Sequence, residues 1–183
     1  MEGLQEIILG GSGGQGLALA GVLLAQSFAE EEGKNVLQTE AYGISMRGGL
    51  SRAEILVSSE EINELRVTEP DILLAMSQEA CARFIDKVKK GGKAILDSLY
   101  VNEVAETKGT VYFIPLTEEA RRMGRENVAN VIALGAVASI TGVIGKQSLE
   151  NTLRKRFSGS VGELNLKALN RGFELGQAQK DSR

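Results

Sequence analysis

The sequence of 183 residues contains no histidine, no tryptophan and a single cysteine, Cys81. Without histidine, the protein has no Ser-His-Asp triad, no imidazole metal site and no imidazole general base. One cysteine excludes an internal disulfide framework, a cysteine-ligated iron–sulfur cluster and a zinc site built from four thiolates. We expect Cys81 to be a small buried side chain rather than a nucleophile, because no histidine is present to activate it.

Strong net charge and long apolar runs are also lacking. The 21 basic and 24 acidic residues give a formal net charge of −3, whereas nucleic-acid-binding proteins present a basic face. The longest apolar candidate, residues 128–144, is interrupted by Asn130, Ser139 and Thr141, so we expect no membrane span. The first residues are acidic where a signal peptide is basic, which favours a reducing cytoplasmic location.

The composition and length fit one ordinary globular domain, because 43% of the residues are hydrophobic and two domains would each be small. We expect a single domain over residues 1–179 and a disordered tail over residues 180–183. Short apolar runs predict strands at residues 7–9, 36–39, 52–57, 72–76, 93–97 and 110–114. Helical periodicity predicts helices at residues 17–32, 78–90, 117–123, 127–143, 148–157 and 161–177.

The strands and helices alternate in the first two thirds of the chain. This order predicts an α/β fold with a Rossmann-like, doubly wound, mostly parallel sheet and a cover of C-terminal helices. The alternating residues of segment 52–57 predict a half-exposed strand. Segment 127–143 is apolar almost all round, which indicates a core helix first and a close helix–helix interface as the alternative.

A glycine loop joins the first predicted strand to the first predicted helix. Residues 11–16, GSGGQG, satisfy the pattern G-x-G-x-x-G in the strand–loop–helix context that the pattern requires. Such a loop allows close approach of an anion to the unpaired N–H groups of the helix N-terminus. We interpret the loop as a binding site for a phosphate-bearing ligand, with Glu40 placed to accept a hydrogen bond from a ribose hydroxyl of that ligand. The alternative is that the glycines only permit close packing of strand and helix.

A second glycine loop, residues 42–49 with the sequence YGISMRGG, follows the second predicted strand. The carboxyl ends of the strands form the edge where open α/β sheets bind ligands. Arg47 beside two glycines offers a bidentate fork to a phosphate or carboxylate, and the alternative is a solvated arginine in a surface turn. Asp71 and Asp97 flank strands and are candidates for acid–base chemistry, although their spacing implies no carboxylate pair.

Several segments, taken in order, resemble the gamma subunit of 2-oxoacid:ferredoxin oxidoreductases. They are GSGGQG at 11–16, YGISMRGG at 42–49, SRAE at 51–54, EPDILLAMSQEA at 69–80, ILDS at 95–98, NVAN at 127–130 and LGA at 134–136. The likeness extends over roughly residues 7–176, nearly the whole chain. The form SMRGG is nearer to the 2-oxoglutarate and branched-chain classes than to the pyruvate class.

The resemblance implies an oxidoreductase complex that oxidatively decarboxylates a 2-oxoacid, with 2-oxoglutarate expected, to an acyl-CoA and reduces ferredoxin. It places thiamine diphosphate between alpha and beta subunits, and iron–sulfur clusters in beta or in a ferredoxin-like delta subunit. The gamma subunit would be a non-catalytic, Rossmann-like companion on the coenzyme A side. This chain alone is then expected to hold no cofactor or metal, to be inactive, and to form a homodimer or aggregate when isolated.

The resemblance also implies which residues face coenzyme A or a partner subunit. They are Gly11, Ser12, Gly13, Gly14, Gln15, Gly16, Tyr42, Arg47, Gly48 and Gly49. The competing hypothesis is a stand-alone nucleotide-binding enzyme, such as a small NAD-dependent dehydrogenase. It would need a substrate domain or an acid–base set, which neither the length nor the absence of histidine favours.

Overall fold

The fold is known from a computed structural model that describes residues 3–42 and 49–182. Within these residues six strands form one sheet in the order β2-β3-β1-β4-β5-β6. The strands are β1 (Gln5–Ser12), β2 (Asn35–Tyr42), β3 (Leu50–Ser58), β4 (Ile72–Ala75), β5 (Lys93–Asp97) and β6 (Thr110–Ile114). The predicted α/β class is confirmed, and each predicted strand segment contributes a strand.

The sheet is mixed because β3 runs against the other five strands. Strands β1, β4, β5 and β6 pair in parallel, whereas β3 pairs antiparallel with both β1 and β2. A short connection such as residues 43–49 can join neighbouring strands only as a hairpin. In the sheet order β3 lies between β1 and β2, whereas a doubly wound sheet would place β2 directly beside β1.

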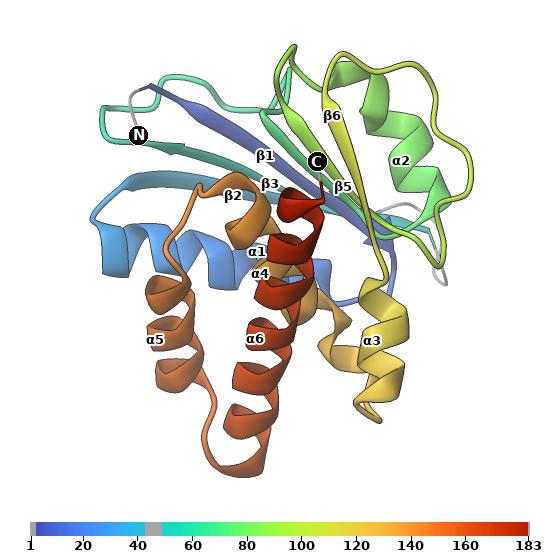
Figure 1. Cartoon of the computed structure of the whole chain (residues 1–183). Helices are drawn as coiled ribbons and strands as arrows, with labels where there is room; N and C mark the ends of the chain where they lie inside the picture. The colour runs from blue at the N-terminus through green and yellow to red at the C-terminus, as the bar shows by residue number, and fades with distance from the viewer. Residues whose placement is uncertain (1–2, 43–48, 183) are drawn as a thin grey trace.

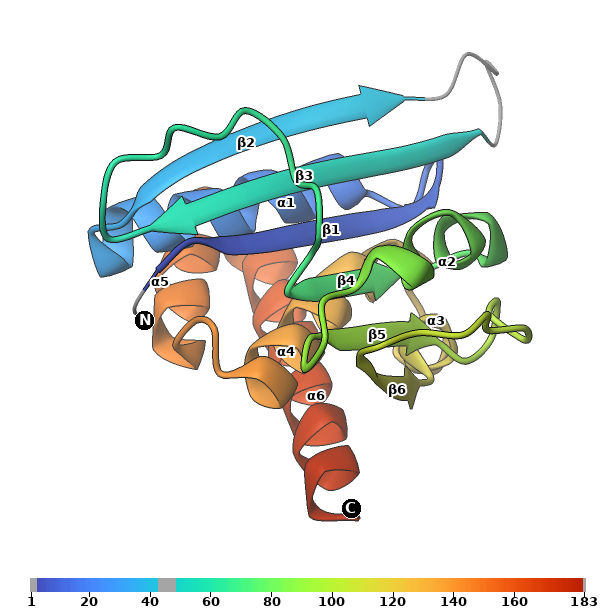
Figure 2. The ribbon, with the colours of Figure 1, turned by 90° about the horizontal axis from the view of Figure 1, so that it is seen from above.

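The prediction that segment 52–57 is half-exposed was wrong. Ala53, Ile55 and Val57 face the helical core and are fully buried, as the alternation indicated. On the other face, Glu54 and Leu56 are also buried, at 8% and 2% exposure. The long connection from β3 to β4 crosses that face (Figure 2). The alternation of apolar residues along the strand does not reveal that a distant segment covers its second face.

Most helices cover one face of the sheet, and α2 (Gln78–Phe84) covers the other (Figure 1). The helices of the larger layer are α1 (Leu17–Gln26), α3 (Leu116–Arg122), α4 (Ala129–Thr141), α5 (Lys146–Arg156) and α6 (Gly159–Asp181). The main core lies between this layer and the sheet, and a smaller core lies under α2. No helix in the described parts of the chain is long and apolar enough to cross a membrane.

Several helix ends differ from the prediction. After Gln26 the chain forms a π-helical turn, Ser27–Glu31; α2 gives way to a 3-10 turn, Ile85–Lys87; and another, Glu126–Val128, precedes α4. Helix α6 continues to Asp181, two residues beyond the expected end of the domain at residue 179. Lys180 extends from the last turns of α6 and its Nζ donates to the carbonyl of Ser139, 3.2 Å away.

Helices α4 and α6 pack with their backbones close together. A Cβ atom on Gly172 would lie 1.8 Å from the carbonyl oxygen of Ile132, and one on Gly135 would lie 2.2 Å from that of Leu169. At the same time α4 is buried along its length from Ala129 to Ile140. Both alternatives raised for this segment therefore hold: α4 is a core helix and a close helix–helix interface.

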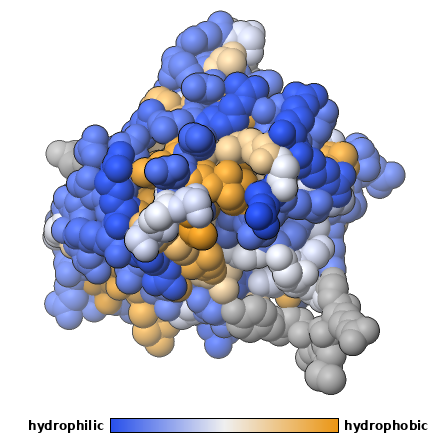
Figure 3. Space-filling model, turned by 90° about the horizontal axis from the view of Figure 1, so that it is seen from below, coloured by the Kyte–Doolittle hydropathy of each residue, from blue (hydrophilic) through white to orange (hydrophobic). Residues whose placement is uncertain are grey.

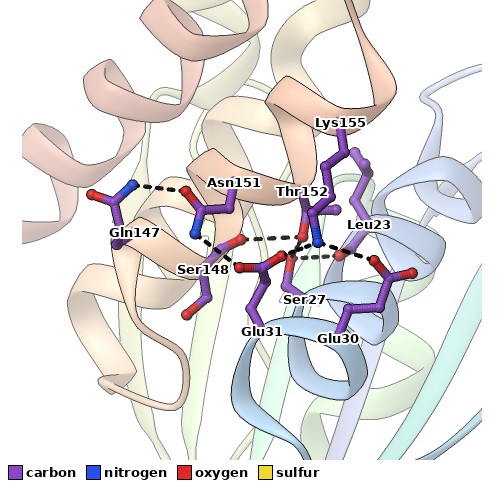
Figure 4. Close-up of polar contacts among 9 residues, drawn as sticks. All are labelled: Leu23, Ser27, Glu30, Glu31, Gln147, Ser148, Asn151, Thr152 and Lys155. Carbon is purple, nitrogen blue, oxygen red and sulfur yellow. Dashed lines mark hydrogen bonds and ion pairs between the residues drawn. The ribbon is translucent and has the colours of Figure 1, made fainter.

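A polar network joins the π-helical turn to α5 (Figure 4). The buried Ser27 Oγ lies 2.8 Å from Thr152 Oγ1. Glu31 accepts hydrogen bonds from Asn151 at 2.8 Å and from Lys155 at 2.5 Å. The hydrogen bond from Lys155 lowers the pKa of Glu31, so the carboxylate remains charged and α5 is held against the end of α1.

Candidate functional site

The first glycine loop lies at the carboxyl end of β1, beside the described ends of the second loop. Gly11 and Ser12 are the last residues of β1, and residues 13–16 form the turn into α1. The N–H of Gly13 donates to the carbonyl of Gly49, 2.9 Å away. Gly49 immediately precedes β3, whose first residues pair with Gly11 and Ser12. The described ends of the second loop, Tyr42 and Gly49, therefore lie on the same side of the sheet as the first loop, and the convergence of the remaining residues 43–48 stays a prediction.

The side chain of Gln15 points into the protein rather than toward a ligand. Its Oε1 accepts from the N–H of Ser12 at 2.7 Å, and its Nε2 donates to the carbonyl of Met76 at 2.8 Å. Gly11 leaves room for this arrangement, since a Cβ there would lie 2.3 Å from Gln15 Oε1. The Gln15 amide therefore ties the glycine loop to the end of β4.

Gly16 is held from the helical layer by a residue that sequence reasoning did not select. The buried Asn130, at the start of α4, donates from Nδ2 to the carbonyl of Gly16 at 3.0 Å. Gly16 has φ 75°, and a Cβ on it would lie 2.6 Å from Asn130 Nδ2. The signal available in the sequence was a polar asparagine at the start of an otherwise apolar helix. The sequence did not show that its partner is Gly16.

The turn into α1 also contains backbone N–H groups that the described residues leave unpaired. Among the described residues, no group accepts a hydrogen bond from the N–H of Gly14 or Gly16, and α1 has no side-chain cap. Gly14 has φ 94°, and a Cβ there would point into open space. These donors lie at the positive end of the dipole of α1, so the arrangement suits an anionic group.

A hollow of about 240 Å³ adjoins the loop. On one side it is lined by Gly14, Gln15 and Met76, and on the other by residues that begin α3 and α4: Thr117, Glu126, Asn127 and Ala129. A larger hollow of about 700 Å³ lies at the amino ends of the strands, beside Gln5 and Lys93. Ligands of open α/β sheets bind at the carboxyl ends, so the smaller hollow is the candidate site.

Asp97 supports the wall of this hollow. Its carboxylate is fully buried and accepts from the N–H of Thr117 at 3.2 Å, from the Thr117 hydroxyl at 2.5 Å and from the N–H of Leu99 at 3.2 Å. Burial raises the pKa of Asp97, against the lowering effect of these hydrogen bonds. Asp97 thus caps the start of α3 from the end of β5, a structural role rather than acid–base chemistry.

Other predicted residues lie away from the hollow. Asp71 precedes β4 at the amino end of the strand, opposite to the end where Asp97 lies, and it pairs with Lys89 at 3.0 Å. The structure therefore does not bring Asp71 and Asp97 together. Glu40 is on β2 and β3 separates it from β1, which removes the geometry expected for a ribose contact. Cys81 is fully buried, as predicted, and burial raises the pKa of its thiol.

The second loop is described only at its ends. Tyr42 ends β2, where its backbone pairs with Ser51, and Gly49 accepts from Gly13. Arg47 and Gly48 lie outside the described residues, so their predicted ligand contact stays a prediction. Within the described ranges, no three carboxylate or thiol side chains gather as a metal site would require.

The sequence matches a known family over most of its length. Residues 6–175 match the family model described as pyruvate ferredoxin/flavodoxin oxidoreductase. The chain belongs to this family. It is 37% identical over 174 residues to 2-oxoglutarate synthase subunit KorC of Methanocaldococcus jannaschii, and the match covers 93% of each chain. The corresponding subunit of Archaeoglobus fulgidus is 38% identical over 173 residues, which cover 94% of this chain and 88% of the relative.

Solved structures of family members have the same fold. The keto/oxoacid ferredoxin oxidoreductase gamma subunit of Geobacter sulfurreducens superposes with a TM-score of 0.88 at 37% identity, over 97% of this chain and 98% of that one. The 2-oxoglutarate:ferredoxin oxidoreductase of Magnetococcus marinus superposes with a TM-score of 0.86 at 26% identity, over 97% of this chain but 32% of that chain. This family member is therefore a gamma subunit of a 2-oxoacid:ferredoxin oxidoreductase, as the sequence motifs predicted.

Proposed function

We propose that this gamma subunit forms the coenzyme A side of a site that converts a 2-oxoacid, 2-oxoglutarate, to its acyl-CoA, and that it performs no chemistry alone. The observation that carries the proposal is the glycine loop at the start of α1: among the described residues, none accepts from the N–H groups of Gly14 and Gly16, and Gly14 lines the hollow. Such donors recognise phosphate groups, and coenzyme A bears several. The superposed Magnetococcus marinus enzyme, whose structure holds 2-oxoglutarate, coenzyme A and succinyl-CoA, supports the choice of ligand.

The size of the hollow supports a shared site. Sites that enclose a drug-sized ligand measure about 300–1,000 Å³, and this hollow measures about 240 Å³. It has room for a phosphate or pyrophosphate group but not for a whole coenzyme A molecule. Partner subunits would therefore supply the remaining walls, and this chain would contribute binding rather than reaction chemistry.

We assign the remaining cofactors to partner subunits. The single cysteine is fully buried inside α2, so this chain offers no thiolate set for an iron–sulfur cluster. Thiamine diphosphate would be held by alpha and beta subunits, the clusters by beta or a ferredoxin-like delta subunit, and ferredoxin would accept the electrons. The match to only 32% of the Magnetococcus marinus chain supports a site completed by further protein.

The stand-alone dehydrogenase hypothesis loses its geometric basis. A dinucleotide-binding fold places the second strand beside the first, so that its acidic end reaches the ribose. Here Glu40 pairs with Ala53 of β3, and Ala53 in turn pairs with Leu9 of β1. An intervening strand separates Glu40 from the glycine loop, so Glu40 is not placed to accept a hydrogen bond from a ribose hydroxyl of a dinucleotide bound there.

The isolated chain is expected to carry no iron and to reduce no viologen dye with 2-oxoglutarate and coenzyme A. It should self-associate, since Figure 3 shows apolar side chains gathered on the face seen from below. Val161, near the start of α6, is also 54% exposed. Co-expressed alpha, beta and delta subunits should co-elute with it and reduce the dye only when coenzyme A is present. Metal analysis, size-exclusion chromatography and the dye assay test this. Coenzyme A-dependent dye reduction by this chain alone would contradict the proposal.

In the assembled complex, Arg47→Ala is expected to raise the KM for coenzyme A roughly 30- to 150-fold. This corresponds to the loss of about 2–3 kcal/mol for a charge-assisted bidentate contact to phosphate. Gly13→Val should act in the same direction by blocking the approach of phosphate to the loop backbone. The KM for 2-oxoglutarate should stay unchanged, because that substrate would bind in the partner subunits.

Steady-state kinetics of the complex with Arg66→Ala provides the matched control, since Arg66 is an exposed arginine in the connection before β4. An unchanged KM for coenzyme A in Arg47→Ala would mean that Arg47 is a solvated arginine. Dissociation of the complex would instead identify the second loop as an interface element.

A further inference from the structure

We infer that Gln15 and Asn130 are positioning residues that hold the glycine loop in its ligand-binding shape without touching the ligand. The inference rests on the proposed function, since it concerns how the same loop binds a phosphate group of coenzyme A. It changes the role of Gln15, which the sequence placed among the contact residues, and adds Asn130, which the sequence did not place in the site.

Gln15 joins the loop to the neighbouring parallel strand. The β1–β4 ladder continues past the end of β4 through the N–H of Met76, which donates to the carbonyl of Gly10 at 2.8 Å. Beyond that point the Gln15 amide takes over: it accepts from Ser12 at 2.7 Å and donates to Met76 at 2.8 Å. Both ends of one side-chain amide are used: the bond to Ser12 fixes the shape of the loop, and a shift of the loop relative to β4 would break the bond to Met76.

Asn130 fixes the other end of the loop from the helical layer. The carbonyl of Gly16 accepts two hydrogen bonds, one from the N–H of Ala20 in α1 and one from Asn130 Nδ2, each at 3.0 Å. Asn130 is 2% exposed, and its Oδ1 lies 2.9 Å from the N–H of Val131. A buried amide with both ends in use therefore sets the direction of the first turn of α1 relative to α4.

Together the two amides pair polar backbone groups of the loop without using the N–H groups of Gly14 and Gly16. The N–H of Ser12 and the carbonyls of Gly16 and Met76 are paired inside. The N–H groups of Gly14 and Gly16 have no acceptor among the described residues. A phosphate would therefore meet donors that need no rearrangement on binding, and preorganisation of this kind increases affinity.

The variants Gln15→Glu and Asn130→Asp test the inference in the assembled complex. Each keeps the size of the side chain and its acceptor oxygen but removes the donated hydrogen bond to Met76 or to Gly16. We expect each variant to raise the KM for coenzyme A about tenfold, as the loss of one buried hydrogen bond implies. The kcat and the KM for 2-oxoglutarate should stay within about twofold of wild type. Titration with desulfo-coenzyme A, which cannot react, should show the same loss of affinity.

Matched controls are Gln26→Glu at the far end of α1 and Asn170→Asp on α6, both partly exposed. They should change none of these constants. A normal KM for coenzyme A in both Gln15→Glu and Asn130→Asp would overturn the inference. So would a parallel change of kcat and both KM values together with a lowered Tm, because that pattern indicates a merely structural role. If one variant fails to assemble, the other decides.

Failure of the proposed function would look different. In that case no substitution in the glycine loops would change the affinity of the complex for desulfo-coenzyme A. This includes Arg47→Ala and Gly13→Val. If those loop changes weaken binding and the two amide variants do not, the proposed function stands and the positioning role is wrong.

Discussion

Replacing Gly172 with alanine is expected to lower the free energy of unfolding by about 3 kcal/mol, or roughly 6–12 °C in Tm. The added methyl group would lie 1.8 Å from the carbonyl oxygen of Ile132 and 2.7 Å from its carbonyl carbon. These are backbone atoms of α4, so no side chain can rotate away and the two helices must separate. The gain in helix propensity from glycine to alanine, about 1 kcal/mol, is too small to compensate.

Thermal and urea unfolding of the full chain measure this change. Lys167→Ala, at an exposed position of the same helix, is the control and should shift stability by less than about 0.5 kcal/mol. A Gly172→Ala variant with the Tm of wild type would show that α4 and α6 do not approach through Gly172. Gly135→Ala should be destabilising for the same reason, because its methyl group would lie 2.2 Å from the carbonyl oxygen of Leu169.

Replacing Asp97 with alanine is expected to cost about 3 kcal/mol of unfolding free energy. The change leaves the N–H groups of Thr117 and Leu99 and the Thr117 hydroxyl without their acceptor in a buried place. Asp97→Asn keeps one acceptor oxygen and should cost less. Asp86→Ala, at an exposed position, should be nearly neutral. Urea unfolding measures all three, and an Asp97→Ala variant as stable as wild type would contradict the capping role.

The pH dependence of stability gives a second test of Asp97. Burial raises its pKa above the unfolded value of about 3.9, so the folded chain binds this proton more readily than the unfolded chain does. The resulting stabilisation is fully present below the unfolded pKa and is lost as the pH rises through the folded pKa. The stability of wild type relative to Asp97→Asn should therefore fall over that window and stay constant above it.

In the difference between wild type and Asp97→Asn, the contributions of the other carboxylates to the pH dependence cancel. Glu119, for example, is held by a hydrogen bond from Arg171 that lowers its pKa. Its contribution has the opposite sign, because it is present at neutral pH and lost as the pH falls. A difference between wild type and Asp97→Asn that does not change with pH would contradict the raised pKa of Asp97.

Local pattern was enough to predict much of this protein. The strand segments, the glycine loop between residues 11 and 16 and the burial of Cys81 depend on residues close in sequence, through side-chain period and the freedom of glycine at turns. The ordered motifs also identified the gamma-subunit family, which the comparisons confirmed.

Tertiary structure alone decided how these pieces form a site. The position of β3 between β1 and β2 removed Glu40 from the glycine loop. Contacts across the chain, from Asn130 to Gly16 and from Asp97 to Thr117, set the direction of α1 and the wall of the hollow. Local period reports which face of an element is buried but not which distant group will lie against it, because that choice follows from how strands pair and helix layers pack.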